Sequence, residues 1–244
     1  MHSGIYTAYS GMKAQMDALD VLSNNLANIN TTGFKEQKTF FSALNTAMDS
    51  SATPQLDSAI NAHAVVAQGA VDLSSGSLVQ TSNDLDVALS GNGLLTVETP
   101  AGVRYTRNGN LTTDSKSVLC TSQGYPVLGE AGHIVLGPGK VNIDQDGQIA
   151  LNGVRVDRLK IASFDDPASL SLEGGSLLAS QNNQTPKAAT NVTVRQGYLE
   201  ESNVNPMLAT VRMVELMRNF EAIEKGVNLM VNDLDEKAID RLSR

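Results

Sequence analysis

Apolar residues recur every seven positions at both ends of this 244-residue chain. The N-terminal rows are Ile5, Met12, Leu19 and Leu26, and, three positions further on, Ala8, Gln15, Leu22 and Ile29, in which Gln15 is the one polar interruption. The C-terminal rows are Met213, Phe220, Val227 and Leu234, and then Leu216, Ile223 and Met230. Such a repeat places one apolar stripe along a helix that packs against another helix. We therefore expect both ends to be helical and to pair, with each other or with neighbouring copies of the chain.

The C-terminal repeat also carries a helix start. Asn205 stands where a side chain caps the first free backbone N–H groups, and Pro206 follows at the first helical position. A single helix with so narrow a stripe is only marginally stable in water, and each Leu or Phe buried on it contributes roughly 1.5–3 kcal/mol. The alternative is that both ends are ordinary amphipathic helices packed on a globular core.

The centre of the chain shows short β-rich pieces and tight turns instead. Asn108-Gly109, Asp146-Gly147 and Asn152-Gly153 are dipeptides that readily adopt the positive φ angles of two-residue hairpins. The β-rich pieces around them lie at 94–98, 117–121, 133–136 and 192–194. This pattern predicts an antiparallel β domain in the centre of the chain.

The expected fold class is α+β, with long N- and C-terminal helices paired as a coiled-coil-like layer and a central antiparallel β domain. The stretch before the β domain is rich in Ala, Ser, Thr, Asn and Asp and has weak periodicity, which is typical of an extended connector. The four expected segments are the N-terminal helix at 1–41, the connector at 42–83, the β domain at 84–199 and the C-terminal helix at 200–244.

Composition argues against several classes of protein. The net charge of −8 disfavours a nucleic-acid partner, because phosphate binding requires a basic surface. Cys120 is the only cysteine, which excludes an intramolecular disulfide and a multi-cysteine zinc site; we expect it to be a buried apolar residue. No apolar stretch approaches the length of a membrane-spanning helix, so membrane insertion is not expected. The N-terminus lacks the pattern of a cleavable signal, which indicates the cytoplasm unless another export route operates.

Candidate catalytic and metal sites are weak. Residues 142–147 match the first half of a calcium-binding loop, but Gly153 stands where the bidentate glutamate should be. We therefore expect Asp144 and Asp146 to shape a hairpin turn. The sequence holds three histidines, His2, His63 and His133. None has the spacing of a zinc motif or lies in a known nucleophile pattern, so we expect no catalytic residue, no cofactor and no metal.

Longer motifs at both ends resemble the bacterial flagellar rod and hook family. The first is SGIYTAYSGMKAQMDALDVLSNNLANINTTGFK, in which a helix leads into NNLAN, a short spacer and TGFK. The second is QGYLEESNVNPMLATVRMVELMRNFEAIEK, in which QG, LE and SNVN lead into the last helix. Between them, LDVALSGNGLLTVETPAGVRYTRNGNLTTD is similar to the β domain of that family. Two independent motifs at opposite ends, in the right order, make the resemblance specific.

The resemblance implies a structural subunit rather than an enzyme. In that family the terminal helices pair and stack around a central export channel, and the β domain forms an outer layer. Subunits leave the cytoplasm through the flagellar type III export apparatus without a cleaved signal, and they polymerise into the axial rod that crosses the periplasm. The implied partners are further copies of the chain, other rod or hook subunits and the export apparatus.

The length of the chain and the composition of its connector indicate which member of the family it resembles. The chain has the length of the two intermediate rod members, and residues 42–68 lack the glycine- and proline-containing connector of the distal one. We therefore expect the proximal rod member, with a distal rod or hook subunit as the alternative. In a different class, a monomeric β-domain binding module would need no heptad repeats at both ends. An enzyme is the third class and has no supporting motif.

The resemblance also suggests a role for the amide-rich stretch 24–35. Asn24, Asn25 and Asn28 would supply amides for contacts between subunits. An amide both donates and accepts hydrogen bonds where burying a charge would be costly. The alternative is an asparagine-rich helix terminus followed by a glycine stop.

Two residues complete this stretch. Gly33 is expected to end the helix in a left-handed conformation, and Phe34 is expected to pack where the chain leaves the helix. The residues expected at subunit contacts are therefore Asn25, Asn28, Gly33 and Phe34, together with the apolar residues of the heptad rows, Ala8 excepted.

Overall fold

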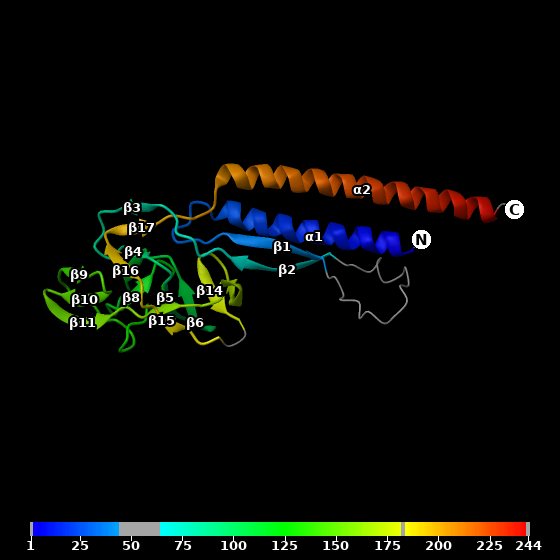
Figure 1. Ribbon diagram of the computed structural model, residues 1–244. Coiled ribbons are helices and arrows are strands. Elements are labelled where there is room, and N and C mark those ends of the chain that lie inside the picture. The colour runs from blue at the N-terminus through cyan, green and yellow to red at the C-terminus, as the bar shows by residue number, and fades with distance from the viewer. Residues whose placement is uncertain (1, 44–63, 182–183, 243–244) are drawn as a thin grey trace. The chain divides into compact units, whose positions relative to one another are not determined.

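The computed structural model describes residues 2–43, 64–181 and 184–242. A helix stands near each end of the chain, with strands between them (Figure 1). Helix α1 spans His2–Ala27 and helix α2 spans Pro206–Leu242. The α+β class predicted from the sequence is confirmed. α2 also begins at Pro206, as predicted from the fixed φ of proline at a first helical position.

The described chain divides into two compact units. The first, the helical unit, holds nearly all of α1, all of α2 and most of the two-stranded sheet of β1 (Gln37–Ala43) and β2 (Ala64–Val71). The second, the β unit, spans Asn25–Lys38 and Ala70–Asn205. The predicted connector is only partly described, because 44–63 lie outside the described residues. Its later part forms β2 and β3 (Leu78–Gln80).

A six-stranded sheet forms the centre of the β unit. Its order is β13-β14-β6-β5-β12-β15, and every neighbouring pair is antiparallel, as the sequence predicted. Its strands are β5 (Leu94–Thr99), β6 (Gly102–Thr106), β12 (Ile161–Ser163), β13 (Leu170–Leu172), β14 (Leu177–Ser180) and β15 (Lys187–Ala188). A short 3-10 helix at Pro167–Ser169 precedes β13.

Smaller sheets complete the β unit. Three of them pair two strands each: β3 with β17 (Tyr198–Glu200), β4 (Val87–Ser90) with β16 (Thr193–Gln196), and β7 (Leu111–Thr113) with β8 (Leu119–Thr121). A fourth has the order β11-β10-β9, from β9 (Val141–Ile143), β10 (Gln148–Leu151) and β11 (Val154–Arg158). Because β16 and β17 pair with β4 and β3, the segment before α2 is an integral part of the β unit.

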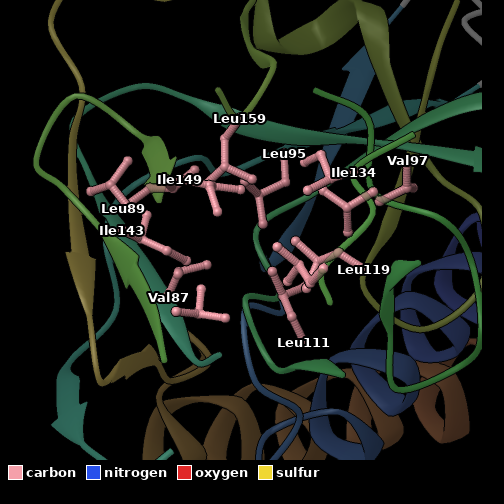
Figure 2. Close-up of a cluster of buried hydrophobic side chains, with 14 of the residues drawn as sticks. Val87, Leu89, Leu95, Val97, Leu111, Leu119, Ile134, Ile143, Ile149 and Leu159 are labelled. Atoms are coloured by element: carbon pink, nitrogen blue, oxygen red, sulfur yellow. The ribbon is translucent and has the colours of Figure 1, made fainter. Parts of the chain in front are cut away.

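Aliphatic side chains from most of these strands meet in one buried cluster (Figure 2). Val97 and Ile149 are completely buried there, and the labelled side chains converge from strands far apart in the sequence. Because only 4% of the residues are aromatic, this cluster is built from Val, Leu and Ile, and each contributes roughly 1.5–3 kcal/mol to stability on burial. Cys120 is 3% exposed and lies on β8, so its predicted burial is confirmed. Burial raises the pKa of its thiol.

Two of the three predicted hairpin turns are present. Asn152 (φ 52°) and Gly153 (φ 82°) connect β10 to β11, and Leu151 pairs with Val154. Asp146-Gly147 lies between β9 and β10, where Oδ1 of Asp144 accepts hydrogen bonds from the backbone N of Asp146 (3.0 Å) and of Gln148 (2.9 Å). Asp144 therefore shapes a hairpin turn, as predicted, but the connection is longer than the expected two residues, because β9 ends at Ile143 and β10 begins at Gln148.

The third predicted turn, Asn108-Gly109, was wrong. β6 before it and β7 after it do not pair with each other. Gly109 instead lies against β4, where a Cβ would come within 1.7 Å of the carbonyl oxygen of Val87. The glycine permits a close approach of two backbones rather than a hairpin. Among the β-rich pieces, 133–136 also makes only isolated bridges, through His133 and Val135.

Candidate functional site

A buried ionic cluster joins three distant parts of the β unit. The carboxylate of Glu200, at the end of β17, contacts Nζ of Lys35 at 2.6 Å through one oxygen and Nε of Arg107 at 2.6 Å through the other. All three side chains are at most 2% exposed. Lys35 ends the TGFK motif, Arg107 lies in YTRNGN and Glu200 lies in QGYLE. We call these three residues the ionic junction.

Backbone carbonyls complete the junction. Arg107 donates to the carbonyls of Leu89 (2.6 Å) and Gly91 (2.7 Å), and also to that of Gly93. Nζ of Lys35 donates to the carbonyl of Ser74 at 2.6 Å. Two cations thus share one carboxylate, and carbonyl dipoles supply the remaining acceptors. Such pairing is required for charges to remain buried without a prohibitive cost.

Gly33 sits beside the junction in a conformation and a space that only glycine fits. Its φ is +67°, the left-handed conformation predicted for it, but α1 already ends at Ala27, so the prediction that Gly33 ends the helix was wrong. A Cβ on Gly33 would lie 2.3 Å from the backbone N of Asn108, and its own N–H donates to the carbonyl of Glu200 at 2.7 Å. Phe34 follows and is completely buried, as expected for the exit of the helix. Both residues therefore have roles within the chain.

One amide of the NNLAN stretch, the side chain of Asn25, makes hydrogen bonds within the chain. Its side chain donates to the carbonyl of Gln37 at 2.9 Å and accepts from the N–H of Gln37 at 3.0 Å. The amide is 1% exposed and pairs with the backbone at the start of β1. This pairing holds the two sides of the turn that follows α1 together, so the Asn25 amide is already used inside the chain. Asn28 is half-buried, and its predicted contact with another subunit stays a prediction.

Asn203 provides a second amide clamp. Its Oδ1 accepts from the N–H of Glu36 at 2.7 Å, and its Nδ2 donates to the carbonyl of Asp72 at 2.9 Å. Segments at 36, 72 and 203 are therefore fastened together next to the ionic junction. Sequence reasoning placed no role on Asn203, although it lies in the SNVN motif.

We predict that Asn25→Ala destabilises the β unit by roughly 1–3 kcal/mol, because a partly buried backbone donor and acceptor of Gln37 lose their partner. Urea unfolding of the full chain measures this. Asn30→Ala is the control, since Asn30 is an exposed asparagine of the same turn and a surface change costs within about 0.5 kcal/mol. Equal effects of the two substitutions would contradict the role assigned to Asn25.

The residues of the ionic junction shift each other's pKa values. Burial lowers the pKa of Lys35 below its ordinary value, and the hydrogen bond and charge of Glu200 oppose that shift. Burial by itself would raise the pKa of Glu200, but the charge of Arg107 and the hydrogen bonds from Lys35 and Arg107 outweigh it, so this pKa lies below its ordinary value. The carboxylate is therefore ionised at neutral pH.

The lowered pKa of Glu200 predicts acid lability. A carboxylate whose pKa is lower in the folded state stabilises the fold above its unfolded pKa of about 4.3, and this stabilisation is lost as the pH falls through the folded pKa. The urea midpoint of the full chain should therefore fall steeply with acidification below about pH 5. Glu200→Gln, which cannot titrate, should show a flatter slope in that range. Identical slopes for both proteins would contradict the assignment.

The predicted helical seams are partly buried in the described structure. Leu22 is buried, and the half-buried members are Met12, Leu19, Leu26, Ile29, Met213, Leu216, Phe220, Ile223 and Val227. The most buried stripe of α1 is instead Ala14, Ala18 and Leu22. The side chains of Ile5, Met230 and Leu234 lie outside those whose surroundings the structure describes. No subunit contact is tested by a single chain.

No catalytic arrangement emerges from the described residues. They contain no group of three or more His, Cys, Asp or Glu side chains placed to hold a metal ion. Neither helix, over its described residues, has the length and apolar character required to cross a membrane. What the geometry offers is a junction, within the β unit, between the segment that follows α1 and the segment that precedes α2.

Models of three protein families match the chain in sequential order. The model described as Flagella basal body rod protein matches residues 5–35. The one described as Flagellar hook protein FlgE/F/G D1 domain matches 88–151, and Flagellar basal body rod FlgEFG protein C-terminal matches 195–240. Each matched segment contributes one residue to the ionic junction: Lys35, Arg107 and Glu200, respectively.

Whole proteins also match from end to end. The flagellar basal-body rod protein FlgF of Caulobacter vibrioides is 30% identical over 248 residues, which cover 100% of this chain and 99% of that protein. FlgF of Salmonella typhimurium is 33% identical over 258 residues, covering 100% and 99%. FlgG of Bacillus subtilis, also named a flagellar basal-body rod protein, is 29% identical and covers 97% and 98%.

Proposed function

The chain belongs to the family of flagellar basal-body rod proteins, and from this premise we propose that its two terminal helices make the contacts that polymerise it into the rod. Its role is structural rather than catalytic. The ionic junction, in this proposal, fixes where the N- and C-terminal segments leave the β unit. The helices are then free to be used for assembly.

The distribution of apolar residues on α2 carries this proposal. At 100° per residue, Met207, Val211, Val214 and Leu229 lie on the side of the helix opposite Leu216, Phe220 and Val227. The latter three are half-buried, whereas the first four are 79%, 51%, 45% and 71% exposed. We call these four exposed residues the outer face. A helix that is apolar on two opposite sides needs cover on both.

Helix α1 also has apolar residues on two opposite sides, one buried and one exposed. Ala14, Ala18 and Leu22 are buried on one side, and Tyr9 and Met16, on the other, are 67% and 54% exposed. α1 and α2 belong to the same compact unit. We infer that the buried sides pair within one subunit, as a coiled-coil-like layer, and that the exposed sides contact neighbouring subunits. The second contact repeats head to tail, which generates a helical polymer when the rotation does not close.

The family premise extends the proposal to location and partners. We propose that the chain reaches the periplasm through the flagellar type III export apparatus without a cleaved signal or membrane insertion. Its neighbours in the rod would be further copies of itself and other rod or hook subunits. Matches to both FlgF and FlgG support a rod position, and the proximal member remains the preferred one, with a distal rod or hook position as the alternative.

Deleting the gene in its host bacterium tests this function. We predict complete loss of swimming, because a rod with a missing segment supports no hook, and restoration by the intact gene on a plasmid. Electron microscopy of the remaining basal bodies then separates the two positions: a proximal subunit leaves almost no rod, and a distal one leaves a short rod. Normal swimming of the deletion strain would contradict a rod function and favour a separate β-domain binding protein.

A further inference from the structure

A cavity of about 490 Å³ lies in the β unit, and none of its lining residues belongs to the ionic junction. Its walls come from β5, β6, β12 and β15, which belong to one sheet, from the end of β11 and the loops at 130 and 146, and from the chain following β15. Tyr105, Ala162, Ala188 and Val192 contribute apolar surface. The volume falls in the range of sites that hold small molecules, and such sites combine apolar walls with a few polar groups.

Thr96 is the first of these polar groups. It lines the cavity and is 2% exposed, yet its hydroxyl has no hydrogen-bond partner among the described residues. Thr96 pairs with Tyr105 across β5 and β6, so both side chains project from the same face of the sheet. Buried hydroxyl groups are nearly always hydrogen-bonded, and an unpaired one indicates a missing partner.

Lys160 is the second. Three cationic residues line the cavity, and two have ion-pair partners: Arg158 with Glu130 at 3.7 Å, and Lys187 with Asp165. Lys160 is exposed, and its ammonium has no such partner among the described residues. The acidic residues Glu130 and Asp146 also line the cavity. Lys160 also adjoins Thr96, because the N–H of Thr96 donates to the carbonyl of Lys160 at 3.2 Å. The hydroxyl of Thr96 on β5 and the ammonium of Lys160, which directly precedes β12, therefore belong to neighbouring segments beside apolar walls.

We propose that this cavity binds a small amphipathic carboxylate, with the apolar body against Tyr105, Ala162 and Val192. The carboxylate would accept hydrogen bonds from the Lys160 ammonium and the Thr96 hydroxyl. A carboxylate matches these groups because it accepts from both and neutralises the charge. A neutral alcohol lacks the charge, and an amine would be repelled by Lys160. This binding is independent of the proposed rod function.

Titration of the isotope-labelled full-length chain with hexanoate, followed by amide chemical shifts, tests the proposal. We expect saturable shifts at Thr96, Tyr105 and Ala188, with hexanol binding at least about tenfold more weakly because it makes no charge-assisted hydrogen bond. Lys160→Met should weaken hexanoate binding by about tenfold for the same reason. Thr96→Val should weaken hexanoate binding less than Lys160→Met does, because it removes a hydrogen bond but leaves the cation in place.

Lys116→Met is the matched control, since Lys116 is an exposed lysine away from the cavity. It should leave hexanoate binding unchanged. A parallel titration with N-acetyl-Leu-Asp-amide asks whether the carboxylate belongs to a free small molecule or to a peptide side chain. No saturable shift with either probe, equal affinity for hexanoate and hexanol, or equal losses in Lys160→Met and Lys116→Met would each overturn the proposal.

Discussion

Glu200→Ala is expected to cost the β unit about 3–5 kcal/mol, because it leaves two buried cations without their carboxylate. Lys35 would keep only its bond to the Ser74 carbonyl, and Arg107 only its carbonyl partners. That loss is a large fraction of the 5–15 kcal/mol by which domains are typically stable. The measurement is urea unfolding of the full chain, monitored by circular dichroism.

The neighbouring residue provides the control. Glu201 has the same chemistry and is exposed, so Glu201→Ala should change the free energy of unfolding by no more than about 0.5 kcal/mol. In cells, Glu200→Ala should abolish swimming and Glu201→Ala should preserve it. A β unit that keeps its stability without Glu200 would show that the junction does not hold the chain ends.

Val214→Glu is expected to abolish rod assembly while leaving the folded subunit intact. Val214 is 45% exposed on the outer face of α2, so a charge there remains solvated in the free subunit and changes its stability by no more than about 0.5 kcal/mol. In the proposed polymer the same charge would be buried against a neighbour without a partner, which is costly. Swimming and the rods of isolated basal bodies are the readouts.

Two further variants sharpen this test. Asn219→Glu adds the same charge at an exposed position of α2 between the two apolar sides, and it should preserve swimming. Phe220→Ala removes a half-buried side chain and should lower the stability of the helical unit itself. If Val214→Glu lowered stability as much as Phe220→Ala does, the outer face would belong to the interior of the subunit, contrary to the proposal.

Local patterns were sufficient to predict several features of the fold. The seven-residue spacing of apolar residues predicts that both ends of the chain are helical. Pro206 predicts the start of α2, and Asn152-Gly153 predicts the turn between β10 and β11. Each depends on residues adjacent in sequence, whose conformational preferences act without the rest of the chain. Asn108-Gly109 shows the limit of this reasoning. There the glycine serves contact with β4, which only the folded chain brings near.

The ionic junction could not be predicted from the sequence, because its residues come together only in the folded chain. Lys35 and Glu200 are 165 positions apart, and Arg107 and Glu200 are 93 apart. All three lie in motifs that the sequence singled out, but nothing in the spacing indicates that their charges pair. In α1, the heptad rows also misplaced the most buried stripe. Ala14, Ala18 and Leu22 lie four residues apart on one side of α1, and of the three only Leu22 belongs to a predicted row.

A cryo-electron microscopy map of rods isolated from the host bacterium tests the central claim most directly. The account predicts that Met207, Val211 and Val214 of one copy are buried against another subunit, while Lys35, Arg107 and Glu200 remain joined within each copy. The claim would be contradicted by rods that contain this chain with the outer face of α2 open to solvent, or by rods that do not contain it.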